Sequence, residues 1–227
     1  MRFFTLLIVL CTGPSFSLIS HRALNSVQTR HLQQRLTDTD AASTTTWVAD
    51  GLSQSDLMHK DECIVVNERD SILGHRSKYD THKFTAGNPA GVLHRAFSVF
   101  LFDAQGRLLL QKRAASKITF PGVWTNTCCS HPLYGYQPCE VDDAESVSSG
   151  SVLGVRHAAI RKLQHELGIA EGRFSVGDFK YLTRLHYSAP DEFTRGTAAD
   201  PSTSEEEKAS DPFRCWGESE VDYILLL

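Results

Sequence analysis

The chain has 227 residues, of which 41% are hydrophobic and 22% charged, and its formal net charge is −4. This length fits one globular domain with additional segments, and the weakly negative charge argues against nucleic acid as a partner. No apolar run reaches the length that crosses a bilayer, so we expect no membrane span.

The first sixty residues are typical of targeting sequences. Arg2, an apolar run and turn-forming residues together predict a signal peptide over residues 1–16, with a buried N-terminal strand as the alternative. Residues 17–60, rich in Ser, Thr, Gln, His and Arg at first, predict a transit-like or disordered presequence. A signal followed by a transit-like segment favours import into a plastid, and simple secretion is the alternative.

The cysteines agree better with a reducing compartment. Cys11 leaves with the signal peptide, and the five cysteines that remain are an odd number. The adjacent Cys128 and Cys129 are a poor start for a disulfide framework. A plastid stroma suits such cysteines better than an oxidising compartment.

The folded domain is predicted to span residues 61–227. Its first strand covers residues 62–66, and a richly apolar strand covers residues 95–102. A turn at residues 103–106 and a returning strand at 107–111 predict a hairpin.

The second half of the domain carries the most regular helix. Residues 134–151 are predicted to be an exposed connection, and apolar residues at helical spacing predict a helix over residues 155–167, ended by Gly168. Strands follow at 179–187 and at 216–227. These elements indicate an α/β domain with a mixed β-sheet flanked by helices.

Two features near the C-terminal end complete this picture. Residues 188–215 are acidic and rich in Pro and small residues, which predicts a flexible loop with a solvated surface. The chain ends on the apolar residues 225–227, and no sequence remains to cover them. We therefore expect a fold that is incomplete at the C-terminus.

Histidines and acids suggest a metal site. His82, His94 and His131 lie near loops or strand starts, where a single histidine is more often a surface or packing residue. Glu218 and Glu220, two residues apart on a predicted strand, point to one face, and burying both requires a cation or a shared proton. A solvent-exposed strand face is the alternative. Nitrogen and oxygen ligands favour Mg²⁺, with Mn²⁺ or Zn²⁺ possible.

A thiol and a basic cluster add candidate chemistry. Cys129 lies on an irregular loop, where neighbouring charges can tune a thiol for proton transfer, although a small buried hydrophobe is the commoner role. Lys112, Arg113 and Lys117 follow the predicted hairpin. They suit a diphosphate beside a carboxylate-held metal, and a solvated edge is the alternative.

Four separated segments resemble the type I isopentenyl-diphosphate isomerases. They are residues 92–102 (VLHRAFSVFLF), 117–132 (KITFPGVWTNTCCSHP), 181–187 (YLTRLHY) and 216–225 (WGESEVDYIL). The resemblance covers about residues 62–227 apart from the acidic loop, and it implies a Nudix-like fold.

A further segment, residues 161–169 (RKLQHELGI), is similar to the second half of a Nudix box. It departs from the hydrolase pattern at Lys162 and His165, where acids are expected. Hydrolysis of a diphosphate is therefore the weaker alternative.

The resemblance implies a role for each matching residue. The ligands of a first metal would be His82, His94, His131, Glu218 and Glu220, and Glu166 would hold a second Mg²⁺ on the substrate phosphates. The residues around the diphosphate would be Lys78, Arg113, Lys117 and Ser130. Cys129 and Glu220 would transfer protons, and Tyr187 would support the glutamate.

The implied reaction is the isomerisation of isopentenyl diphosphate to dimethylallyl diphosphate, through a tertiary carbocation in a water-excluding pocket. The expected partner is this small prenyl diphosphate alone, bound to a monomer. Family members continue beyond the last strand into a helical segment whose tryptophan packs over the cation. A fragment of a longer enzyme is thus one interpretation, and a truncated relative that binds metal or diphosphate without catalysis is the other.

Overall fold

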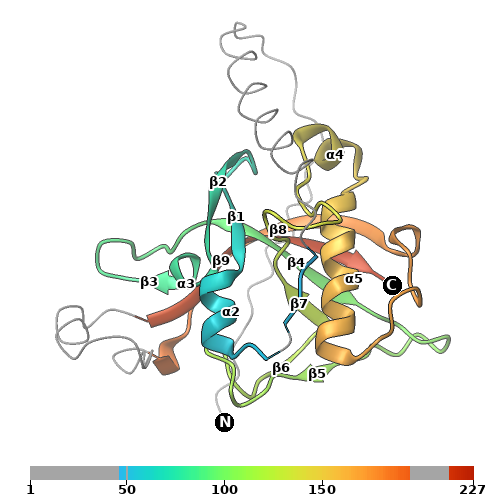
Figure 1. Ribbon diagram of the computed structural model, residues 1–227, viewed down its shortest axis with the longest axis horizontal. Helices are drawn as coiled ribbons and strands as arrows, with labels where there is room; N and C mark the ends of the chain where they lie inside the picture. Colours follow the sequence, from blue (N-terminus) through green and yellow to red (C-terminus); the bar gives the residue numbers. More distant parts are fainter. Residues whose placement is uncertain (1–45, 50, 195–214) are drawn as a thin grey trace, which may run out of the picture.

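The computed structural model describes residues 46–49, 51–194 and 215–227 (Figure 1). The predicted signal peptide, most of the predicted presequence and residues 195–214 of the acidic loop lie outside these described residues. None of the helices in the described part is long and apolar enough to cross a membrane.

A mixed sheet of seven strands forms the centre of the domain. Its strands are β1 (Glu62–Val66), β2 (Ile72–Ser77), β3 (Lys83–Phe84), β4 (His94–Phe100), β7 (Cys128–Ser130), β8 (Lys180–Pro190) and β9 (Cys215–Leu226). The order is β2-β1-β4-β9-β3, with β7 paired to β4 and β8 paired to β9. Because β4 and β9 run parallel while the other strand pairs are antiparallel, the predicted mixed sheet is confirmed.

The C-terminal strand β9 lies inside the sheet, between β4 and β8. In this register Glu220 faces His94 on one side and Tyr187 on the other. The expectation that residues 225–227 would be left uncovered was wrong for Leu225, which is fully buried and packs in the main core, whereas Leu226 and Leu227 are half-buried. Two neighbouring strands and a helix cover β9, which the sequence order alone does not reveal.

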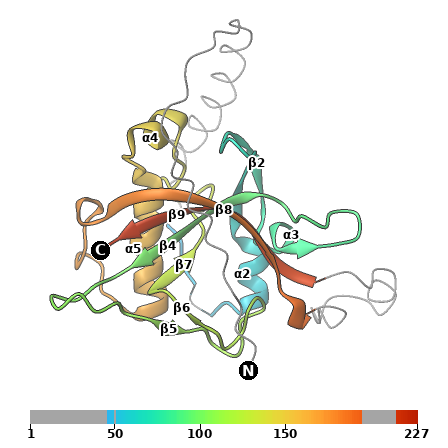
Figure 2. The same ribbon diagram turned by 180° about the vertical axis from the view of Figure 1, so that it is seen from behind.

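The long helix α5 (Leu153–Leu167) confirms the predicted helix and packs its small and apolar side chains against the sheet (Figure 2). The Asp142 carboxylate accepts hydrogen bonds from the backbone N of Gly154 and Val155, two donors that a helix start leaves unpaired. A Cβ at Gly154 would lie 2.5 Å from the carbonyl carbon of Glu140, so only glycine allows this close approach. Gly168, in the left-handed conformation, ends the helix as predicted.

The exposed connection predicted for residues 134–151 is only partly correct. This segment contains the short helix α4 (Ala144–Ser149), and it buries Glu140 and Asp142. Glu140 is buried because Arg161 on α5 contacts its carboxylate at 2.6 Å, and Asp142 because it caps α5. Their partners lie on a helix further along the chain, which made these acids look like surface residues.

The hairpin predicted for residues 95–111 was wrong in its second strand. The turn forms, with Arg107 O accepting from Asp103 N at 3.0 Å and Leu101 O accepting from Leu109 N at 2.9 Å, but β4 ends at Phe100 and the pairing beyond it is a single bridge, Phe102 to Leu108. Beyond it the Thr127 hydroxyl comes between the two segments: it accepts from Leu101 N and donates to Leu109 O. The chain then pairs elsewhere, and β5 (Gln111–Lys112) joins β6 (Trp124–Thr125).

The folded domain begins earlier than the predicted boundary at Asp61. Helix α2 (Gln54–Lys60) starts at a capping box in which Ser53 and Asp56 satisfy each other's backbone N–H, and its Met58 packs on Trp216. The predicted acidic loop also begins later than residue 188, since β8 runs to Pro190 and a 3-10 turn, η2 (Glu192–Thr194), follows. Two further short helices complete the described part, α3 (Lys78–Thr81) and η1 (Val176–Asp178).

Candidate active site

The predicted site residues lie around one pocket. Its empty volume is about 490 Å³ when the open space at its mouth is included. Every one of them except His94 and the exposed Lys112 lines it: Lys78, His82, Arg113, Lys117, Cys129, Ser130, His131, Glu166, Tyr187, Glu218 and Glu220. Four lining residues were not predicted, namely Gln54, Met58, Ile118 and Thr119. The placement agrees with the implied site, and the individual roles stay predictions.

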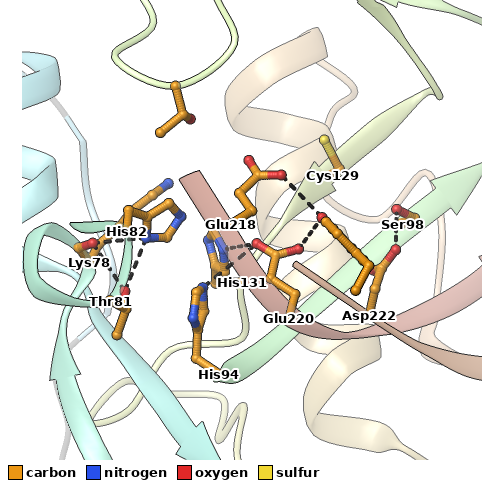
Figure 3. A network of polar contacts seen from close by, with 12 residues as sticks. Lys78, Thr81, His82, His94, Ser98, Cys129, His131, Glu218, Glu220 and Asp222 are labelled. Atoms are coloured by element: carbon orange, nitrogen blue, oxygen red, sulfur yellow. Dashed lines mark hydrogen bonds and ion pairs between the residues drawn. The ribbon is translucent and has the colours of Figure 1, made fainter. Parts of the chain in front are cut away.

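Four buried side chains form a compact nitrogen and oxygen cluster at one end of the pocket (Figure 3). Ligand atoms of His82, His94, His131 and Glu220 all lie within 4.8 Å of one another. His131 Nε2 lies 2.8 Å from Glu220 Oε1, and His94 Nε2 lies 3.6 Å from the same oxygen. The fifth predicted ligand, Glu218, lies outside this group.

Two of the three histidines of this cluster, His82 and His94, are oriented by backbone carbonyls. His82 Nδ1 donates to Lys78 O at 2.8 Å, and His94 Nδ1 donates to Val92 O at 2.7 Å. The Nε2 atoms of both rings are buried without a hydrogen-bond partner. A ligating histidine characteristically donates its other ring N–H in this way, which fixes the tautomer.

The charge of the cluster also fits a cation. Burial lowers the pKa of His82, and it lowers the pKa of His131 to about 3, so both rings are neutral at physiological pH. Burial opposes ionisation of Glu220, but the interactions with His131 and His94 together outweigh it and hold the pKa of Glu220 well below its usual range. Neutral imidazoles beside one carboxylate suit a divalent cation with a preference for nitrogen and oxygen ligands.

The carboxylates of Glu218 and Glu220 meet at Tyr187. Both lie on the same face of β9, as their spacing predicted, and the Tyr187 hydroxyl lies within hydrogen-bonding distance of Oε2 of each. Burial and then the charge of Glu220 raise the pKa of Glu218 to about 7. Tyr187 thus fixes the position of two carboxylates that differ in their affinity for a proton.

Cys129 lies in the same pocket and is seen near the two glutamates in Figure 3. The irregular loop predicted for it was wrong, because Cys129 is on strand β7 and pairs with Ser98 of β4. The sulfur of Cys129 is 3.7 Å from Arg113 Nη1 and 3.9 Å from Thr125 Oγ1. Burial, followed by the charge of Glu218, raises the pKa of the Cys129 thiol to about 12, against the opposing charge of Arg113. The thiol therefore carries its proton at neutral pH, whereas Glu220 does not.

Glu166, near the C-terminal end of α5, is surrounded by positive charge. Lys117 Nζ and Lys162 Nζ each lie 3.2 Å from its Oε1, and Gln111 Nε2 donates to its Oε2. Although burial opposes ionisation, the charges of Lys162 and Lys117 hold the pKa of Glu166 far below its usual range. Lys162, at a position where hydrolases are expected to carry an acid, instead neutralises Glu166.

Comparisons with known proteins agree with this geometry. A NUDIX domain model matches residues 92–220. Isopentenyl-diphosphate Delta-isomerase II, chloroplastic, of Arabidopsis thaliana is 41% identical over 222 residues, which cover 96% of this chain and 68% of that protein. The chain belongs to the isopentenyl-diphosphate Delta-isomerase family. It carries the NUDIX fold of that family, as its sequence motifs predicted.

Other members of the isopentenyl-diphosphate Delta-isomerase family show a similar match. Isopentenyl-diphosphate Delta-isomerase I of Clarkia breweri is 42% identical over 202 residues, and an isomerase of Gibberella zeae is 46% identical over 165 residues. This chain spans 60% and 54% of the length of these two proteins. The family assignment thus rests on a core that the longer relatives share.

Proposed function

We propose that this chain isomerises isopentenyl diphosphate to dimethylallyl diphosphate by adding one proton to the substrate and removing another. The observation that supports this proposal is the shared pocket of Cys129 and Glu220, two groups in opposite protonation states. A proton added to the terminal alkene carbon gives a tertiary cation at the neighbouring carbon. Loss of a proton from the carbon beside the diphosphate-bearing one forms the new double bond. One group must start protonated and the other must start free.

The cation site is proposed to hold Mg²⁺, with Mn²⁺ or Zn²⁺ as alternatives. His82, His94, His131 and Glu220 would hold it, with Glu218 as a further ligand. Bound there, a divalent cation fixes the position of the Glu220 carboxylate and sets its basicity. Tyr187 keeps Glu220 oriented from the opposite side through its hydroxyl.

Basic and hydroxyl residues of the same pocket are proposed to bind the diphosphate. Lys78, Arg113, Lys117 and Ser130 line the pocket, and the arginine offers a forked donor for phosphate oxygens. Glu166 already contacts two lysines, so a second Mg²⁺ fits there only together with the negative charge of the diphosphate. We assign Glu166 this role in the substrate-bound state.

The alternative of a Nudix hydrolase has less support. The hydrolase reaction uses a cluster of acids on the α5 segment, whereas this helix places Lys162 next to its one retained acid, Glu166. The alternative of a truncated relative without catalysis has less support, because the two residues proposed to transfer protons, Cys129 and Glu220, line one pocket. The proposal therefore remains with isomerisation.

An assay of the products separates these functions. The full chain is incubated with isopentenyl diphosphate and Mg²⁺, and the products are followed by nuclear magnetic resonance. Dimethylallyl diphosphate is the expected product. Inorganic phosphate or diphosphate would select the hydrolase, and binding of the substrate without any conversion would select the non-catalytic relative.

The site of action is proposed to be a plastid. The Arabidopsis thaliana relative is named chloroplastic, and residues 1–16 and 17–60 were predicted to be a signal peptide and a transit-like presequence. A fluorescent protein fused to residues 1–47 is expected to accumulate in plastids of an alga with complex plastids. Secretion of the fusion would contradict this destination.

A further inference from the structure

The pocket is built from two parts of the chain that lie far apart in sequence. Arg113 and Cys129 come from the segment that begins with β5 and ends with β7, whereas Tyr187 and Glu220 come from β8 and β9. Asp191, which does not line the pocket, connects these two parts. Its side chain is fully buried, and its Oδ2 accepts a hydrogen bond from Phe120 N at 2.9 Å.

We propose that Asp191 is a positioning residue that sets the place of Arg113 through residues 119–122, here called the Pro-Gly loop. This proposal rests on the proposed function, because it concerns how the diphosphate-binding and proton-transferring residues of one pocket are aligned. It assigns Asp191 no contact with the substrate.

The Pro-Gly loop has a backbone that needs external support. Phe120 has a φ of 47°, in the left-handed region that residues with a Cβ rarely adopt. Such a conformation persists where the surroundings fix it, and the hydrogen bond to Asp191 is made by the backbone N of this same residue. The next glycine, Gly122, has a φ of 71° and returns the chain toward β6.

The conformation of this loop decides where the Arg113 guanidinium lies. Arg113 Nε donates to Phe120 O at 3.0 Å, and Nη2 donates to Thr119 O at 2.8 Å and to Thr119 Oγ1 at 3.1 Å. These bonds use three of the five guanidinium hydrogens. Nη1 remains for Cys129, at 3.7 Å, and for an anion in the pocket.

Asp191 is in turn tied to the strand that carries the glutamates. Its backbone N donates to Trp216 O at 2.7 Å, and its O accepts from Thr194 N at 2.9 Å and from Thr194 Oγ1 at 2.8 Å. Thr194 Oγ1 also accepts from Trp216 N. Trp216 precedes Glu218 by two residues on β9, so Asp191 fixes the Pro-Gly loop relative to Glu218 and Glu220.

The test compares two substitutions of Asp191 in the full chain, of which only Asp191→Asn keeps the size of the side chain. Asp191→Ala removes the acceptor for Phe120 N, whereas Asp191→Asn keeps an amide oxygen in the same place. For Asp191→Ala we expect kcat/KM for isopentenyl diphosphate to fall by about 10- to 100-fold, the scale of a catalytic group displaced by about 1 Å. Asp191→Asn is expected to recover most of the wild-type value.

Repeating the test in a chain that carries Arg113→Ala separates a positioning role of Asp191 from general damage to the fold. If Asp191 acts through Arg113, the Asp191→Ala change should have little further effect in a chain that already carries Arg113→Ala. Binding of inorganic diphosphate, measured by calorimetry, is expected to weaken about tenfold in Asp191→Ala, the scale of one lost hydrogen bond to a charged group.

Three results would overturn the proposal: wild-type kcat/KM in Asp191→Ala, an equal loss in Asp191→Asn, or an undiminished loss in the Arg113→Ala background. The proposed function is tested independently of the role of Asp191. If the wild-type chain forms no dimethylallyl diphosphate, the reaction is wrong. Weaker binding of inorganic diphosphate to Asp191→Ala than to Asp191→Asn would then still support the positioning role.

Discussion

The substitution Asp70→Asn tests a buried ionic network that holds the frame of the pocket together. Asp70 follows β1, and its carboxylate contacts Arg95 on β4, Arg184 on β8 and Tyr223 on β9. The side chains of Asp70 and Arg95 are 3% and 2% exposed. These strands also carry His94, Tyr187 and Glu220, so the network fixes the elements from which the site is built.

The structure gives an expected magnitude for the stability that Asp70→Asn loses. Asparagine has the size of aspartate and tolerates the left-handed φ of 62° that Asp70 adopts, so the substitution removes charge with little change in shape. It leaves the buried Arg95 guanidinium without its carboxylate, a loss of about 3–5 kcal/mol in the free energy of unfolding. The midpoint of thermal unfolding should fall by about 6–20 °C for a domain of this size.

Urea denaturation followed by tryptophan fluorescence measures this change, and Asp103→Asn provides the matched control. Asp103 also lies in a turn and contacts an arginine, Arg107, but that arginine side chain is 78% exposed. Because solvent screens such a pair, the control should unfold at nearly the wild-type urea concentration. Equal losses in Asp70→Asn and Asp103→Asn would refute the reasoning from burial.

Two further predictions concern the metal and the pH dependence of stability. His82→Ala should lower the content of bound divalent metal after dialysis, measured by mass spectrometry, because it removes one of the proposed ligands, a buried ring with an unpaired Nε2. His75→Ala, at an exposed histidine, should leave the metal content unchanged, and equal metal content in both variants would contradict the site. Burial raises the pKa of Cys63 from 9.0 to about 12. As pH rises, the unfolded chain therefore loses the thiol proton before the folded chain does. The contribution of Cys63 to the free energy of unfolding falls as pH rises from 9 to 12. The stability difference between wild type and Cys63→Ala should therefore shrink over that window by up to about 1.4 kcal/mol per pH unit, and a constant difference would contradict the shift.

Local sequence patterns predicted those helices and strands that a single short segment of sequence defines. The strand over residues 62–66 and the helix that ends at Gly168 follow from apolar spacing and a terminating glycine. The alternation of side chains along a strand placed Glu218 and Glu220 on one face. Motif resemblance then named the residues that line the pocket.

The missed features depend on partners distant in sequence. Helix α2 was interpreted as part of a presequence, because a helix that buries only Leu57 and Met58 has a weak apolar pattern in the sequence. The residues that cover Met58 come from elsewhere in the chain. Asp191 was counted in a flexible acidic loop because Phe120, the partner of its carboxylate, is 71 residues away. A charged residue shows its structural role only when the fold brings its partner to it.

The central claim is that Cys129 and Glu220 exchange protons with one substrate held between them. Its most direct test is turnover of isopentenyl diphosphate in D₂O by the wild type, Cys129→Ala and Glu220→Gln, with circular dichroism as the check on folding. The wild type should form dimethylallyl diphosphate with deuterium in a methyl group, and each variant should be folded and at least about 100-fold slower. Deuterated product formed at the wild-type rate by either variant would contradict the account.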